Sequence, residues 1–485
     1  MAPNRMVRTR RYGLLAGPLA ALTILYWPPP EGLSQAGWIT AAIALVMAIW
    51  WMSEALPLAA TALLPVALFP LLGLVPFEDL GRAYAHPLIF LFFGGLILAK
   101  GLEKWQLHRR LALFLLSYAG DRPSSVIGAV MAATAFLSMW VSNTATAMVM
   151  LPIALSIAST FTGPKAIMDA SQPTPFGSAL MLAVAYSATI GGMGTLIGTP
   201  PNALFAGFML ETYGISIGFA QWMLVGLPAV LILLPITWVL LTQVLFTLPA
   251  RFPQPEDGPA AAGAPPLGPM ARQHYMVAGV MSMVALLWLT RPLVAHLAPE
   301  LPLSDAGIAM AGALILFVLP DQWPKGTFLL SWKDVSDLRF DVLILFGGGL
   351  ALANAIAATG LAAWIGSGIE RFQDLPTMVL ILVIMATIVY LGELASNTAM
   401  AAVFLPVAGA AAVGLGEPPL SLALPVVLAA SLGFMLPVAT PPNAIVYGSG
   451  AVPAQTMLRA GAILDVVSLL LVFGLAMTLG RLVFG

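Results

Sequence analysis

The chain has 485 residues, of which 60% are hydrophobic and only 8% are charged, and its formal net charge is −1. Soluble proteins carry about 25% charged residues, so this composition excludes a soluble globular protein. The near-neutral charge argues against nucleic acid as a partner, and the absence of cysteine excludes disulfides and thiolate metal sites. We expect an all-α polytopic membrane protein that lies almost entirely within the lipid bilayer.

Apolar runs of the length that crosses a bilayer recur along the whole chain. The first, from Tyr12 to Trp27, lacks a small-residue cleavage site, so no cleaved signal peptide is expected. About eleven transmembrane helices are predicted, near residues 12–28, 36–54, 57–75, 86–102, 177–211, 216–247, 273–295, 303–320, 341–359, 419–450 and 457–481. An amphipathic stretch at 103–119 is expected on the membrane surface, and a second follows the ninth crossing around Glu370, Arg371 and Asp374.

Two further apolar segments, 124–160 and 377–414, are each divided by the polar triplet Ser-Asn-Thr. The arms on either side are too short to cross a bilayer of about 30 Å comfortably. Each segment is therefore predicted to be a re-entrant hairpin with its triplet, residues 142–144 or 396–398, at the tip. The two copies continue alike, as SNTATAMVMLP and SNTAMAAVFLP, and eight of these eleven positions are identical.

The tetrapeptide Thr-Pro-Pro-Asn also occurs twice, at residues 199–202 and 440–443, inside a crossing that follows each hairpin. Proline removes a backbone donor and clashes with the preceding turn, so both crossings are predicted to be broken helices. A lone Ser-Asn-Thr is a common helix cap. Two copies, each followed in order by Thr-Pro-Pro-Asn, instead indicate a transporter built from two repeats.

Charge placement predicts the orientation of these repeats. With the arginine-rich amino terminus in the cytoplasm, 16 of the 20 Lys and Arg residues face the cytoplasm, as the positive-inside rule requires. An odd number of crossings separates the hairpins, which places them on opposite faces of the membrane. The repeats are therefore predicted to be inverted, with both triplets meeting near the midplane. Segment 251–272 is rich in Pro, Gly and Ala and is the expected linker between them.

The hairpin tips and broken helices share one chemical property, which is unsatisfied backbone groups. A helix that begins after Asn143 or Asn397 offers free N–H donors and about half a positive charge. Two such ends, facing each other, suit the two carboxylates of a short dianion. No Lys or Arg lies in the core of either hairpin or either broken crossing. We therefore expect mobile cations to offset the substrate, with sodium ions as the natural candidate.

These motifs resemble those of the divalent anion/sodium symporter family, bacterial dicarboxylate-carrier type, and the WMSEALP stretch from Trp51 to Pro57 resembles it too. The resemblance covers nearly the full length. It implies a multi-pass homodimer of the cell inner membrane that works as an elevator and needs no organic cofactor. Scaffold helices would occupy 1–119 and 273–374, and the halves of a mobile transport domain would occupy 120–250 and 375–485.

The resemblance also implies which residues bind. Substrate contacts would come from Asn143, Thr144, Thr199, Pro200, Asn397, Thr398, Thr440 and Pro441. One sodium site would use Ser138, Ser142, Asn143 and Gly198, and the other Ser396, Asn397 and Ala439. Gly392 departs from the family pattern, because sodium-coupled relatives commonly have threonine there. A backbone carbonyl could still serve at that position.

Two carboxylates in the second repeat have no assigned task. Glu393, beside the second tip, either binds or relays a proton or pairs with a backbone or hydroxyl group and holds the hairpin in shape. The structural role is favoured because the first repeat has Met139 at the matching position. Asp465, in the last crossing, is unexplained.

Function follows from these motifs and their resemblance. We expect a secondary active transporter of C4-type dicarboxylates, such as succinate, malate or fumarate, coupled to sodium. Sodium-independent dicarboxylate exchange, which Gly392 favours, and citrate or sulfate transport on the same fold are the alternatives. An enzyme is not expected, because the chain has no cysteine, no HExxH and no Gly-x-Ser-x-Gly in a crossing.

Overall fold

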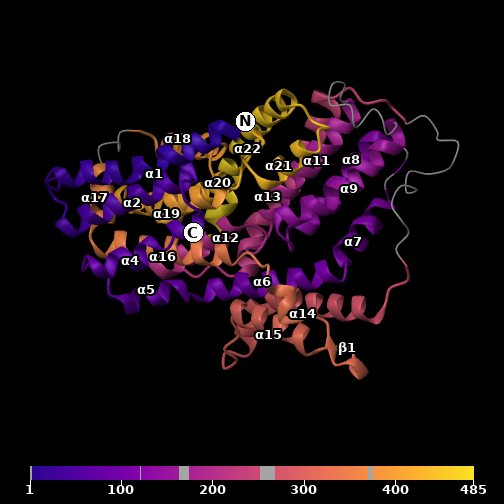
Figure 1. Cartoon of the computed structure of the whole chain (residues 1–485), viewed down its shortest axis with the longest axis horizontal. Helices are drawn as coiled ribbons and strands as arrows, with labels where there is room; N and C mark the ends of the chain where they lie inside the picture. The colour runs from indigo at the N-terminus through magenta and orange to yellow at the C-terminus, as the bar shows by residue number, and fades with distance from the viewer. Residues whose placement is uncertain are drawn as a thin grey trace.

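The computed structural model describes residues 3–118, 120, 122–162, 174–251, 268–369 and 375–484, which are almost entirely helical (Figure 1). The predicted linker lies outside the described residues from 252 to 267. The same holds for residues 163–173 before the first broken crossing and for 370–374 in the second amphipathic stretch.

The first half of the chain forms the helices that precede residue 252. They are α1 (Pro3–Tyr26), α2 (Gln35–Ser53), α3 (Leu58–Thr61), α4 (Leu64–Leu71), α5 (Phe77–Tyr84), α6 (Pro87–Lys104), α7 (Leu107–Leu116), α8 (Pro123–Ser138), α9 (Asn143–Thr162), α11 (Pro175–Gly192), α12 (Pro200–Tyr213) and α13 (Phe219–Val239), which ends in a π-helical turn, Leu240–Leu245.

The second half repeats much of this order. Its helices are α14 (Arg272–Leu297), α15 (Asp305–Val318), α16 (Phe340–Ala358), α17 (Leu361–Ile369), α18 (Thr377–Gly392), α19 (Asn397–Gly414), α20 (Leu420–Ala430), α21 (Pro441–Gly448), α22 (Ala454–Leu475), a π-helical turn at Ala476–Gly480, and α23 (Arg481–Phe484). Strands β1 (Pro320–Gln322) and β2 (Thr327–Phe328) form a small antiparallel hairpin that the sequence analysis did not predict.

Eight helical stretches among the described residues are long and apolar enough to cross a membrane. Seven coincide with predicted crossings, and the eighth is α19, the second arm of the second hairpin. The expectation of short arms is therefore wrong for α19, and α9 of the first hairpin, at 20 residues, is also longer than expected. The apolar sequence of α19 continues past Pro406, so the helix reaches 18 residues.

The predicted crossing at 57–75 is not one helix. It forms α3 and α4, separated near Leu63, and Pro65 stands in the first turn of α4. Proline has no N–H to bond the carbonyl four residues earlier, here that of Thr61, so α3 cannot continue through it.

The two hairpins pack in the same way in both halves of the chain. Helices α8 and α9 both lie against α11, and helices α18 and α19 both lie against α20. The helices after the two breaks cross over, because α12 packs on α19 and α20 while α21 packs on α9 and α11. The hairpins and the helices after the breaks, from both halves of the chain, therefore pack together as one central group.

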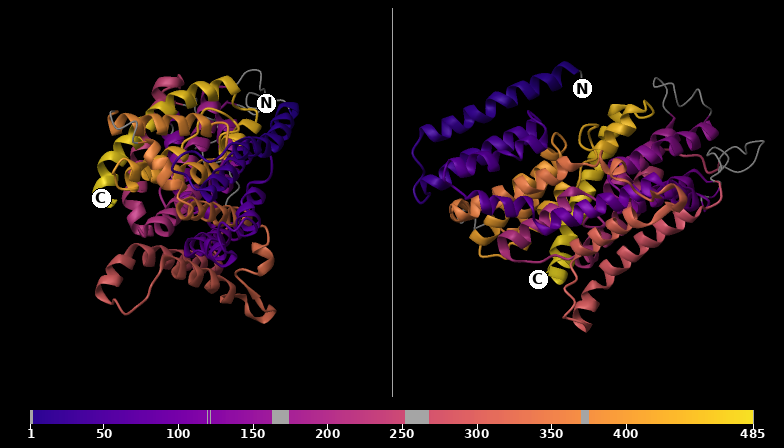
Figure 2. Two further views of the ribbon diagram at one scale, coloured as in Figure 1. Left: turned by 90° about the vertical axis from the view of Figure 1, so that its left-hand side faces the viewer. Right: turned by 60° about the horizontal axis from the view of Figure 1, so that its bottom comes forward.

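The remaining helices pack around this central group. Helix α1 packs along α2, and α15 packs along both α6 and α14. Figure 2 shows α1 at one edge of the molecule and α14 at the opposite edge. Helix α16 contacts α12 of the first half and α19 of the second half, so it packs on both halves of the chain.

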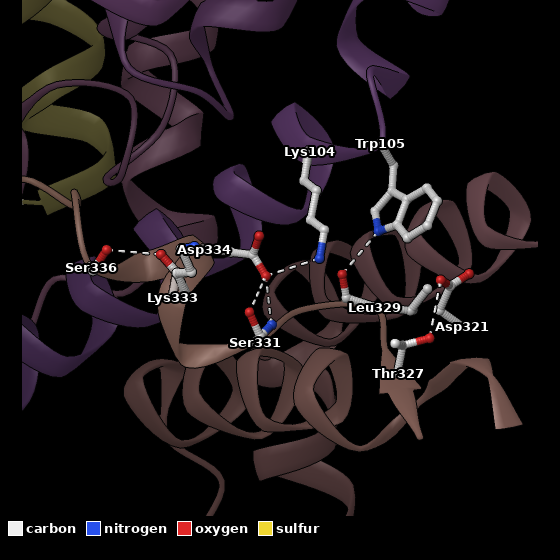
Figure 3. A network of polar contacts seen from close by, with 9 residues as sticks. All are labelled: Lys104, Trp105, Asp321, Thr327, Leu329, Ser331, Lys333, Asp334 and Ser336. Atoms are coloured by element: carbon white, nitrogen blue, oxygen red, sulfur yellow. Dashed lines mark hydrogen bonds and ion pairs between the residues drawn. The ribbon is translucent and has the colours of Figure 1, made fainter. Parts of the chain in front are cut away.

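A polar network holds the loop between α15 and α16 against the end of α6 (Figure 3). Lys104 Nζ lies 2.9 Å from an Asp334 carboxylate oxygen, and Trp105 Nε1 donates to the Leu329 carbonyl at 3.0 Å. The Ser331 hydroxyl and backbone N–H donate to the same carboxylate at 2.6 and 2.7 Å. Burial alone would raise the pKa of Asp334, but the hydrogen bonds from Ser331 and Lys104 outweigh it and lower the pKa.

Candidate substrate and sodium site

Both hairpin tips and both helix breaks line one cavity of about 1140 Å³. The cavity wall contains every residue that the sequence analysis assigned to substrate: Asn143, Thr144, Thr199, Pro200, Asn397, Thr398, Thr440 and Pro441. Residues about 250 positions apart in the sequence thus meet in one place. Ser142, Gly198, Ser396 and Ala439 of the predicted sodium sites also line the cavity, whereas Ser138, Gly392 and Glu393 are buried behind its wall.

The hairpin tips present helix N-termini to this cavity. Helix α9 begins at Asn143 and α19 begins at Asn397, as predicted from the triplets. The Ser142 hydroxyl accepts one N–H, that of Ala145, at 3.3 Å, and the Ser396 side chain makes no capping bond. Backbone donors in the first turn of α19 therefore remain available to an anion.

The last residue of each Thr-Pro-Pro-Asn stabilises the break before it. Asn202 Nδ2 donates to the carbonyls of Thr195 at 2.8 Å and Gly192 at 3.1 Å. Asn443 Nδ2 donates to Leu436 O at 3.1 Å and Gly433 O at 3.4 Å. The acceptors lie seven and ten residues before the asparagine in both cases. These amides replace the intrahelical partners that the breaks, residues 193–199 and 431–440, have lost.

The sequence analysis missed this task of Asn202 and Asn443. The signal was present, because a polar residue directly after two prolines is repeated in both copies. Its role became visible only with the path of the break.

The first predicted sodium site gathers oxygen atoms at the cavity wall and just behind it. One atom of the Asn143 side-chain amide lies 2.7 Å from Ser138 Oγ and 3.2 Å from the carbonyl oxygens of Gly198 and Ala188. With its nitrogen in that place, the amide donates to all three. The three oxygens that surround this amide are the kind of donors that an alkali cation takes. Gly192 is necessary here, because a Cβ at that position would overlap the Asn143 side chain.

The second predicted site has fewer side-chain oxygens. Asn397 Oδ1 is buried and has no hydrogen-bond partner among the described residues, which leaves it free to face a cation. Gly392 occupies the position that corresponds to Ser138 and contributes no side-chain oxygen. A Cβ on Gly392 would meet only Met400 Cγ, at 3.8 Å, so the backbone there accepts a Cβ without a clash.

Glu393 lies behind the second site and holds the second break. Its two carboxylate oxygens accept the backbone N–H groups of Met435 at 3.0 Å and Leu436 at 2.7 Å. Its side chain is nearly fully buried. Glu393 thus pairs with backbone groups, as its favoured structural role requires, but these belong to the second break rather than to its own hairpin.

Two arginines that the sequence analysis did not assign also line the cavity. Arg10 lies 3.1 Å from Glu54, and Arg339 makes hydrogen bonds of 2.8 Å to both oxygens of Asp341. Arg10 lies in α1 and Arg339 directly precedes α16, so both lie outside the hairpins and breaks, whose sequences contain no Lys or Arg. Each arginine is paired with a carboxylate on the same wall, so its charge is largely compensated.

Exposed helix ends around a cavity, in a molecule of apolar helices, define a membrane transporter rather than an enzyme. Residues 9–485 match the family described as "Sodium:sulfate symporter transmembrane region", and the chain belongs to that family.

Curated relatives agree with this assignment. The chain is 37% identical to the sodium-dependent dicarboxylate transporter SdcS of Staphylococcus saprophyticus, over 95% of this chain and 89% of that protein. The protein of the same name from Staphylococcus aureus is also 37% identical, with the same coverage. The crystal structure of the Alcanivorax borkumensis YdaH transporter matches the fold over the full length of both chains, with a TM-score of 0.61 and 14% identity.

Proposed function

We propose that the protein transports C4-type dicarboxylates across the cell inner membrane together with sodium ions. The observation that carries the proposal is the meeting of two helix N-termini, each with an asparagine and a threonine side chain, at one cavity. Such ends stabilise negative charge at two separate points, which matches a short dianion. The similarity to proteins named sodium-dependent dicarboxylate transporters supports the substrate and the coupling ion.

The residues divide into two tasks. Asn143, Thr144, Asn397 and Thr398 donate hydrogen bonds to the two carboxylates, and Thr199, Pro200, Thr440 and Pro441 complete the wall around them. Sodium ions bind behind each tip, one at Ser138, Ser142, Asn143 and Gly198 and the other at Ser396, Asn397 and Ala439. The converging oxygens near Asn143 and the unpaired Asn397 Oδ1 support these two positions.

Transport by an elevator fits the same arrangement. The hairpins and broken helices of 120–250 and 375–485 form one mobile body, and the helices of 1–119 and 273–374 form a scaffold that pairs with a second copy in a homodimer. The crossed packing of α12 and α21 on the opposite repeat supports movement of both hairpins as one unit. The amino terminus lies in the cytoplasm, and the repeats are inverted.

A sodium-independent exchanger is the second candidate, and one observation favours it. Gly392 leaves the second sodium position without the side-chain oxygen that Ser138 supplies to the first. A weaker second site would reduce the dependence of uptake on sodium. Citrate or sulfate remains the alternative substrate, since the cavity of about 1140 Å³ is larger than any of these anions.

Uptake by purified protein in proteoliposomes tests this proposal. Radiolabelled succinate should accumulate when an inward sodium gradient is imposed and should not accumulate when potassium replaces sodium. Uptake that instead requires internal succinate and ignores sodium would establish the exchanger. If citrate or sulfate accumulates and succinate does not, the proposed substrate is wrong.

A further inference from the structure

A second buried carboxylate, Asp465 of α22, lies beside Glu393 behind the second helix break. Asp465 is fully buried, and Glu393 is 2% exposed. Two adjacent carboxylates in a poorly hydrated interior cannot both be ionised without a large electrostatic cost. The pair must therefore bind a positive charge from outside the chain or be stabilised by a basic residue.

No basic residue faces this pair in the described part of the chain. Helices α13, α18 and α20, which pack on α22, contain no Lys, Arg or His, and neither does the second break. Among the described residues, Tyr186 of α11 is the one titratable group besides the acids that is buried here. Tyr390 of α18 and Arg459 of α22 are exposed. The compensating charge must come from a bound ion or proton.

Hydrogen bonding distinguishes the two acids. Both oxygens of Glu393 accept a backbone N–H, and such donors stabilise the ionised form. Neither oxygen of Asp465 makes a full hydrogen bond with the described residues, although a backbone donor of Phe434 and the Glu393 carboxylate both lie close to it. Ser468 Oγ, three residues further along the same helix, is also buried and unpartnered. A buried carboxylate that receives no full hydrogen bond is satisfied when it is protonated, because its carboxyl group then becomes a donor itself.

We propose that Asp465 is a proton-binding site, and that its protonated carboxyl group donates a hydrogen bond to the carboxylate of Glu393. The proton thereby connects α22 to the second break, because Glu393 already holds Met435 and Leu436. Gly461 lies one turn before Asp465 and contacts the backbone of Phe434, so α22 packs directly on this segment. Loss of the proton to water leaves two carboxylates repelling each other at this junction.

The site has a consequence for binding. The second break carries Ala439 and Thr440, which line the cavity. Repulsion between Glu393 and Asp465 displaces this segment, so alkaline pH weakens binding at the second tip. The first repeat has Met139 in place of Glu393, and the effect is therefore confined to one of the two half-sites. The proton site itself does not depend on the proposed function, whereas its effect on uptake does.

The direct test is infrared difference spectroscopy of the full-length protein in lipid, between about pH 7 and about pH 10, where ordinary carboxyl groups stay ionised. Wild type should show the carbonyl band of a protonated carboxylic acid at the lower pH. The band should shift in D2O and disappear at the higher pH. It should be absent in Asp465→Asn and present in Tyr186→Phe, which controls for the nearby phenol. A wild-type spectrum without this band, or one that Asp465→Asn leaves unchanged, overturns the proposal.

Thermal unfolding across the same pH range gives an independent readout. The folded protein binds a proton that the unfolded chain releases, so the unfolding temperature of wild type should fall as pH rises. Asp465→Asn keeps a neutral donor to Glu393 and should lack this component of the fall. A sodium ion at the pair is the competing ligand. If Asp465→Asn lowers the stabilisation by sodium and leaves the pH profile of wild type in place, the site binds sodium and the proton proposal is wrong.

Discussion

The two tip asparagines occupy similar positions but different surroundings. Asn143 lies within hydrogen-bonding distance of Ser138 Oγ and two carbonyl groups, whereas Asn397 Oδ1 is buried without a partner. Both begin a helix and both line the cavity. Each is therefore expected to serve substrate and sodium at once, and truncation of either should remove both functions.

Asn143→Ala and Asn397→Ala should each reduce succinate uptake in proteoliposomes by at least about a hundredfold, since a lost hydrogen bond to a charged group costs about 1.5–3 kcal/mol and the sodium ligand is lost with it. The matched control is Thr387→Ala, because Thr387 is exposed on α18 and its hydroxyl donates to the Val383 carbonyl within its own helix. Normal uptake by either asparagine variant, with the protein folded, would contradict the site assignment.

Gly392→Thr should strengthen the sodium dependence of uptake. A Cβ fits at Gly392 without a clash, and the new hydroxyl would stand at the sequence position that corresponds to Ser138 in the first repeat. Gly392→Val has the same shape without the hydroxyl and is the control. The half-saturating sodium concentration should fall for threonine only. Equal behaviour of the two variants would mean that this position does not determine coupling.

At the level of elements, both breaks are stabilised by an asparagine amide, but the first break is more deeply buried than the second. Residues 193–199 are all buried, whereas Met435 to Val438 are partly exposed. Water can replace the asparagine amide at the second break more readily than at the first. The first break is therefore the more rigid of the two half-sites.

Asn202→Ala should destabilise the protein by about 1–3 kcal/mol, because buried carbonyls lose their donor. Asn443→Ala should cost less, since one of its two acceptors belongs to the partly exposed Leu436 and its bonds are longer. Thermal unfolding of the two variants in one detergent measures the difference. An equal or reversed order would contradict the unequal burial of the breaks.

Asp334→Asn should loosen the loop between α15 and α16 at neutral pH, by about 1 kcal/mol. Because folding lowers the pKa of Asp334, its stabilisation is present above the ordinary carboxyl pKa of about 4 and is lost as pH falls through the lowered value. The difference in unfolding temperature between variant and wild type should therefore shrink in acid. Asp337→Asn removes a more exposed ion pair with Lys100 and should change little. A difference that persists in acid would contradict the role of the charge.

Much of the site could be predicted from the chain because the chemistry is local. The starts of α9 and α19 follow from the triplets, and the breaks follow from the paired prolines. Arg10 and Arg339 could not be predicted, because their place on the cavity depends on how α1 and α16 pack. Apolar helices in lipid have no polar face that encodes such packing. The division of 57–75 could be predicted in part, since Pro65 was visible, but an apolar run of that length resembles one crossing.

In the whole molecule, the cavity is built from both halves of the chain, and neither hairpin could form it alone. Helices α12 and α21 each pack on the hairpin of the other half. A ligand bound at one hairpin tip therefore orders helices that pack on the hairpin of the other tip. Binding of succinate and sodium should accordingly be coupled, and thermodynamic linkage requires that each raise the affinity for the other by the same factor.

Equilibrium binding of radiolabelled succinate to the purified protein, measured at increasing sodium with potassium as the balancing cation, tests this account most directly. We predict that the dissociation constant for succinate falls steeply as sodium rises and that Asn143→Ala and Asn397→Ala abolish the effect. A dissociation constant that is the same in sodium and in potassium would contradict a shared site for the dianion and its cations. A sodium effect that persists in both substituted proteins would contradict it as well.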